Sequence, residues 1–137
     1  MEDDVMFTAV ADHSWSCGPY EEDTTMIFNK VITNIGDGYD NTSGLFTAFT
    51  SGYYYFTLFY HAGTEHVSGL TLMKNSEVIT NTFEDFENGP GFTDNAGKSA
   101  FVKLERGNVV FVRLPAHCQV HASDNTTTFS GFLVRKK

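Results

Sequence analysis

The chain has 137 residues, which suits a single domain over residues 1–137 with a core of its own. Aromatic residues make up 15% of the sequence and charged residues 19%, a composition that excludes an intrinsically disordered chain. The net charge of −8 argues against nucleic acid as a partner, and no apolar run of about 18 residues is present to insert into a membrane.

The predicted elements are short β-strands separated by turn residues, because Thr, Val, Phe, Tyr and Gly dominate the sequence. In chain order, the expected strands cover residues 5–11, 25–32, 45–48, 52–60, 69–75, 77–80, 99–104, 109–114, 118–122 and 127–135. The strands at 99–104 and 109–114 are expected to form a hairpin in which Gly107 supplies the positive φ of the turn. No window has a helical apolar period, so the sequence predicts an all-β sandwich or barrel.

Residues 52–60 are apolar on both faces of the expected strand, since alternate side chains of a strand point to opposite faces. One face carries Tyr54, Phe56, Leu58 and Tyr60, and the other carries Tyr53, Tyr55 and Phe59. Residues 109–114 and 129–134 show the same pattern. A monomer seldom exposes an apolar patch above a few hundred Å². We therefore expect one sheet to be buried against another copy of the chain, because a parallel sheet covered on both faces would need crossover helices.

The spacing of aromatic residues and glycine between Phe28 and Leu58 resembles the signature of the complement C1q globular-domain family, part of the C1q/tumour necrosis factor superfamily. The matching positions are Phe28, Asn34, Tyr39, Phe46, Gly52, Tyr54 and Phe56. Further segments similar to the family are "FTA" at 7–9, "LMKN" at 72–75, "LERGNVVFVRL" at 104–114 and "TFSGFLV" at 128–134. The resemblance therefore extends over nearly the whole chain.

The resemblance implies a ten-stranded jelly-roll β-sandwich that assembles as a compact homotrimer, with an aromatic-rich sheet buried along the threefold axis. Such an assembly would cover the surplus apolar face inferred from the residues. The candidate trimer-interface residues are Tyr53, Tyr55, Phe59, Val109, Phe111 and Phe132. No Gly-x-y collagen repeat and no coiled-coil heptad precedes the domain in this sequence, so we expect either a head-only form or a head cut from a longer protein.

An acidic, glycine-rich loop spans residues 83–97. The resemblance implies a Ca²⁺ site near the top of the threefold axis, with ligands from the corresponding loop. By position, Asp85 and Asp94 match the carboxylates of that site, and Glu87 lies between them as a further candidate ligand. The residues by themselves favour an ordinary solvated acidic loop, because they lack EF-hand spacing.

Cys17 and Cys118 are the only cysteines in the chain. An even number permits one disulfide and does not require it, so a bridge and two buried thiols both stay open. Asn41 and Asn125 each begin an Asn-x-Ser/Thr sequon, which suits the glycosylated surface of a secreted protein. The residues alone leave a cytosolic protein open, and the resemblance implies an extracellular location.

The sequence offers no set of residues suited to catalysis. His117 and His121 would lie roughly 13 Å apart on a strand, too far for both to bind one zinc ion. We interpret them as surface or interface histidines. Residues 12–14, Asp-His-Ser, are consecutive and point alternately to opposite faces, so they cannot form a triad, and we predict that the protein is not an enzyme. Trp15 is expected to cover one end of the sandwich rather than to anchor a ligand.

Taken with the resemblance, these features favour a secreted trimeric recognition module. Its loops would bind microbial surfaces or polyanionic and carbohydrate ligands, and multivalency would raise weak single contacts to useful avidity. One alternative is a hormone-like or synapse-organising ligand that crosslinks a cell-surface receptor. Another is a non-secreted scaffold domain that trimerises a partner.

Overall fold

The computed structural model describes residues 4–62, 67–84 and 95–137, and all regular structure in these ranges is β-strand. The strands are β1 Met6–Val10, β2 Ser16–Cys17, β3 Thr24–Thr25, β4 Lys30–Ile35, β5 Tyr39–Asp40, β6 Leu45–Thr47, β7 Gly52–His61, β8 Ser68–Lys74, β9 Glu77–Glu84, β10 Asn95–Leu104, β11 Val109–Leu114, β12 Val120–His121 and β13 Thr128–Lys136. The all-β prediction is confirmed. Over the same ranges, no helix long and apolar enough to cross a membrane is found.

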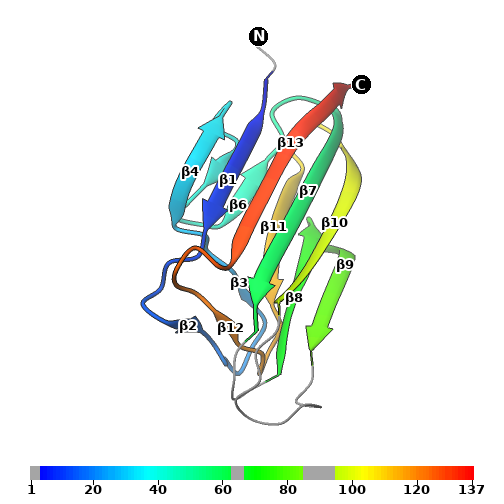
Figure 1. Cartoon of the computed structure of the whole chain (residues 1–137). Coiled ribbons are helices and arrows are strands. Elements are labelled where there is room, and N and C mark those ends of the chain that lie inside the picture. The colour runs from blue at the N-terminus through cyan, green and yellow to red at the C-terminus, as the bar shows by residue number, and fades with distance from the viewer. Residues whose placement is uncertain (1–3, 63–66, 85–94) are drawn as a thin grey trace.

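The strands form two sheets that lie face to face as a sandwich (Figure 1). The first sheet has the strand order β10-β7-β13-β1-β4. The second has the order β5-β6-β11-β8-β9, with β3 paired to β11. A separate two-stranded sheet of β2 and β12 lies at one end of the sandwich, while β1 begins and β13 ends at the opposite end (Figure 1).

Aromatic side chains from the inner faces of both sheets fill the core. The predicted inner set of β7 is fully buried, and comprises Tyr54, Phe56, Leu58 and Tyr60. Phe7 of β1 stacks on Tyr39 and on Phe46 of the opposite sheet, with ring centroids 5.1 Å and 5.2 Å apart. The ring of Phe129 meets Phe7 edge-on at 5.0 Å. Offset and edge-on pairs of this kind contribute free energy beyond the area they bury.

The strand predicted over residues 25–32 is broken into two strands that belong to different sheets. Thr24–Thr25 pairs with β11, whereas Lys30–Ile35 pairs with β1. Residues 26–29 therefore carry the chain from one sheet to the other. Met26 and Phe28 are both buried in this crossing, and their alternation is the feature that looked like a continuous strand.

Tyr39 replaces the lost ladder hydrogen bonds at the crossing. Its hydroxyl donates to the carbonyl oxygen of Phe28 over 2.8 Å and accepts from the amide of Phe28 over 2.9 Å. Burial raises the pKa of the Tyr39 hydroxyl, so it stays protonated and can donate.

We expect Tyr39→Phe to lower the free energy of unfolding by about 2 kcal/mol, because it strands a buried backbone donor and acceptor. Urea denaturation measures the change. Tyr53→Phe is the control, because the Tyr53 side chain is exposed on the first sheet of the single chain, and it should leave the midpoint unchanged. Both changes are compared in a Tyr55→Asp background, so that assembly through this face does not contribute. Equal midpoints for Tyr39→Phe and the unchanged background would show that the crossing does not depend on this hydroxyl.

Residues 99–114 do not form the predicted hairpin. β10 pairs with β7 in the first sheet, and β11 pairs with β6 and β8 in the second. The turn has the expected positive φ, 94° at Gly107, but it links two sheets. The ladder with β7 joins all ten residues of β10, and this long register outcompetes the local hairpin.

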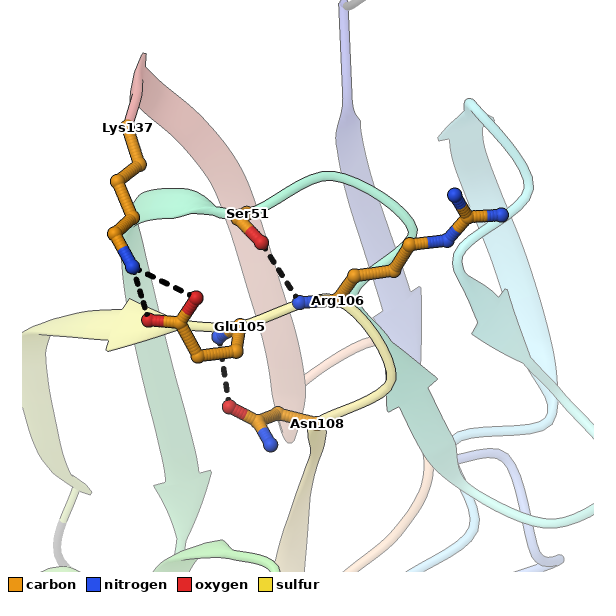
Figure 2. Close-up of polar contacts among 5 residues, drawn as sticks. All are labelled: Ser51, Glu105, Arg106, Asn108 and Lys137. Atoms are coloured by element: carbon orange, nitrogen blue, oxygen red, sulfur yellow. Dashed lines mark hydrogen bonds and ion pairs between the residues drawn. The ribbon is translucent and has the colours of Figure 1, made fainter.

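Hydrogen bonds fasten this second crossing to its surroundings (Figure 2). The amide of Glu105 donates to Asn108 Oδ1 over 2.8 Å, and the amide of Arg106 donates to Ser51 Oγ over 2.9 Å. Lys137 Nζ donates to both carboxylate oxygens of Glu105, over 2.9 Å and 2.7 Å. The hydrogen bonds from Lys137 lower the pKa of the Glu105 carboxyl. The Arg106 guanidinium points away from the group (Figure 2).

Candidate functional site on the five-stranded sheet

An apolar row crosses the outer face of the first sheet. Backbone pairing places one residue of each strand side by side, in the order Phe101, Tyr55, Phe132, Met6 and Ile35. Directly opposed residues of antiparallel strands point to the same face. The inner face is occupied by the core, so this apolar row points away from the core.

The apolar row is exposed in the single chain. Phe101 is 72% exposed and Phe132 44%, and their ring centroids lie 4.8 Å and 5.9 Å from that of Tyr55. Phe59 is also exposed, and its ring lies against Gly97, where an added Cβ would be 2.4 Å from a ring carbon. A side chain at position 97 would therefore displace the Phe59 ring.

The structure brings together four of the six predicted interface residues, namely Tyr53, Tyr55, Phe59 and Phe132. Val109 and Phe111 do not join them, because β11 belongs to the second sheet and its outer side faces the opposite way. The expectation that β11 lies in the same sheet as β7 is wrong, and a place for these two residues in an interface stays a prediction. The expectation assumed that β11 forms a hairpin with β10.

Three residues of the apolar row were missed from the sequence. They are Phe101, Met6 and Ile35. The alternation of residues 99–104 could have indicated that Phe101 points outward. Val102 and Leu104 are buried, and Phe101 lies on the other face of the same strand. Met6 and Ile35 belong to short strands whose outward side cannot be chosen before the pairing partner is known.

A hydroxyl row lies next to the apolar row on the same face. Its members pair across all five strands in the order Ser99, Thr57, Ser130, Thr8 and Thr33. The hydroxyls of Thr8 and Ser130 are hydrogen-bonded at 2.8 Å. A groove of about 240 Å³ follows the boundary between the two rows. A surface that covers this face must therefore offer apolar contacts to one row and polar contacts to the other.

Trp15 does not cover the end of the sandwich as predicted, since 69% of its side chain is exposed. Its ring meets His121 edge-on at 5.2 Å, and His121 in turn meets His61 at 5.2 Å. The buried hydroxyl of Thr127 accepts from the His61 amide and donates to the His121 carbonyl, which holds β12 beside the end of β7. This packing was not foreseen, because it joins residues far apart in the sequence.

The histidines predicted not to form a zinc site have different environments. His117 is exposed and has a φ of 67°, whereas the Nε2 of His121 is hydrogen-bonded to Ser123 Oγ at 2.8 Å. In residues 4–62, 67–84 and 95–137, no three His, Cys, Asp or Glu side chains are grouped so that they could hold a metal ion. The candidate calcium ligands Asp85, Glu87 and Asp94 lie outside the described residues.

Cys17 and Cys118 are both buried and unbridged, which corresponds to the second of the two open alternatives. Burial raises the pKa of both thiols and so disfavours their reactive thiolate forms. The two sequon residues, Asn41 and Asn125, lie in turns, and both are exposed.

A family model described as the C1q domain matches residues 6–134. The chain belongs to the C1q domain family. Among curated proteins, this C1q domain is 36% identical over 128 residues to the complement C1q tumor necrosis factor-related protein 5 of Rattus norvegicus, covering 90% of the chain. It is 30% identical over 130 residues to a complement C1q subcomponent chain of Bos taurus, covering 93% of the present sequence. The chain spans about half the length of these curated relatives, 51% of each.

Solved structures share the architecture of this C1q domain. The globular domain of zebrafish complement 1qA superposes with a TM-score of 0.75 at 20% identity, covering 97% of this chain and 99% of that one. Murine APRIL superposes with a TM-score of 0.73 at 10% identity, covering 96% and 99%. At these identities the likeness shows the fold, and the predicted jelly-roll sandwich is confirmed.

Proposed function

We propose that this C1q domain is an extracellular, homotrimeric recognition module that binds microbial surface ligands multivalently and catalyses no reaction. The observation that carries the proposal is the apolar row, with Phe101 72% exposed at one margin of the sheet. A soluble domain seldom leaves such a face uncovered. The resemblance to the C1q signature supplies a trimer as the assembly that covers it.

The two margins of the first sheet support a ring of chains. β10 forms one edge strand and presents Phe101, while β4 forms the other and presents Ile32 and Ile35, both exposed. The margins are different surfaces, so a contact between them is heterologous, and heterologous contacts close into rings when the rotation permits. A threefold ring would also turn the three hydroxyl rows toward one another.

We expect the trimeric wild type to bind immobilised bacteria or polysaccharide at least about a hundredfold more tightly than a single-chain variant such as Tyr55→Asp, through avidity alone. Surface plasmon resonance measures both proteins on the same surface. The proposal is contradicted by equal affinities for the assembled protein and the single chain.

A receptor-crosslinking signalling ligand is the second candidate. It is favoured by the higher identity to the tumor necrosis factor-related protein, 36%, than to the complement C1q chain, 30%. Saturable binding to cultured cells without binding to bacteria or polysaccharide would select this candidate.

The proposal includes a Ca²⁺ site with Asp85, Glu87 and Asp94 as ligands, because carboxylates are the hard oxygen ligands that Ca²⁺ prefers. We expect millimolar Ca²⁺ to raise the melting temperature, because a ligand at about a hundredfold excess over its Kd stabilises the folded state by about 2.7 kcal/mol. Asp94→Ala should remove most of the rise, and Glu21→Ala, a surface carboxylate in another loop, should not. An identical melting curve with chelator and with Ca²⁺ would rule the site out.

A further inference from the structure

A second candidate site lies on the outer face of the second sheet, on the opposite side of the sandwich from the apolar row. Backbone pairing places Thr25, Arg113, Thr71 and Asn81 side by side across β3, β11, β8 and β9. A groove of about 450 Å³ opens over the last three of them. Asp23, Val78, Thr82 and Pro115 complete its lining.

Arg113 supplies the charge of this groove. Its side chain is 32% exposed, and an acidic partner, Asp23, lies beside it with Nη1 and Oδ2 3.7 Å apart. That separation exceeds the roughly 2.7–3.2 Å of an N–H···O hydrogen bond. The ion pair is therefore loose, and the planar set of donors on the guanidinium can turn to a ligand.

Neutral polar groups and apolar walls flank the guanidinium. Thr71 Oγ1 donates to Asn81 Oδ1 over 2.6 Å. This bond fixes both side chains and leaves the amide hydrogens of Asn81 and the lone pairs of Thr71 for other partners. Val78, which is exposed, and Pro115 add apolar surface to the same groove.

The geometry points to this groove as a binding site for an acidic saccharide, held by its carboxylate on Arg113. A guanidinium matches a carboxylate with two parallel hydrogen bonds. Thr71 and Asn81 can then accept from and donate to the neighbouring sugar hydroxyls. The volume falls in the range of about 300–1,000 Å³ that suits a small ligand. The inference rests on the proposed recognition function and gives it a ligand class.

The test is titration of the full chain with sodium glucuronate, and with glucose as the neutral match, followed by NMR. Glucuronate should bind saturably and shift the side-chain signals of Arg113 and Asn81, and glucose should bind at least about tenfold more weakly. Arg113→Gln should weaken glucuronate binding by about tenfold or more. Arg106→Gln makes the same change at a guanidinium that does not line the groove and that points away from the other residues drawn in Figure 2, and it should not weaken binding. Asp23→Asn should strengthen binding, because it removes the competing carboxylate.

Equal affinity for glucuronate and glucose, or no change with Arg113→Gln at an unchanged melting temperature, would overturn the site. So would weaker binding in Asp23→Asn. The groove lies within one chain, so Tyr55→Asp should leave the glucuronate affinity per chain unaltered. A wild-type protein that is a single chain in solution and still binds glucuronate would count against the proposed assembly alone. A trimeric wild type that does not bind glucuronate would count against the groove alone.

Discussion

Tyr55→Asp is expected to convert the assembled protein into single chains. Tyr55 lies within the apolar row, between Phe101 and Phe132. In the proposed trimer, the new carboxylate would be buried without a partner, which costs several kcal/mol for each of the three copies. Sedimentation velocity at micromolar concentration measures the result.

Two further variants separate assembly from folding. Phe101→Asp places the same charge on the edge strand and should also abolish assembly. The Phe101 side chain is 72% exposed, so its removal should barely change the stability of the single chain. Phe111→Asp changes a residue of the second sheet and should leave the assembly intact. An assembled Tyr55→Asp or Phe101→Asp protein would place the contact elsewhere on the surface.

Phe129→Ala is expected to lower the free energy of unfolding by about 3–5 kcal/mol, the largest effect of any substitution considered for the single chain. The Phe129 ring is fully buried, and its centroid lies 5.0 Å from Phe7, 5.5 Å from Phe28 and 6.0 Å from Phe56. Truncation leaves a cavity between two rigid sheets that cannot close around it. With a total stability of about 5–15 kcal/mol, much of the folded population is at risk.

Urea denaturation of Phe129→Ala measures the loss, and Phe49→Ala is its matched control. Phe49 is 56% exposed in the loop before β7, so its truncation should change the free energy of unfolding by less than about 0.5 kcal/mol. If both variants unfolded at the same denaturant concentration, Phe129 could not be central to the core.

The sequence predicts local strand character far better than partner choice. Along β7 the period-two pattern correctly separates Tyr54 and Phe56, which are buried, from Tyr53 and Phe59, which are exposed. The period depends only on the strand and on one buried face. Residues 25–32 and 99–114 have the same pattern, but the chain changes sheet within each of them. An alternating pattern is found both where the chain continues in one sheet and where it crosses to the other sheet. The pattern therefore could not show that the chain crosses within these residues.

Sites that depend on the register of several strands could not be predicted from the sequence. The groove around Arg113 exists because β11 and β9 both pair with β8 in one register, which aligns Thr71 with Asn81. No local motif reports such an alignment. The exposed apolar face, by contrast, was partly foreseen, because the surplus aromatic residues of β7 place apolar side chains on its outer side whatever the pairing.

The mass of the wild-type chain in solution tests the central claim most directly. Sedimentation equilibrium at micromolar concentration should give three times the chain mass of 15.3 kDa, because the apolar row needs other copies to cover it. A stable, well-behaved species of 15.3 kDa at that concentration would contradict the account.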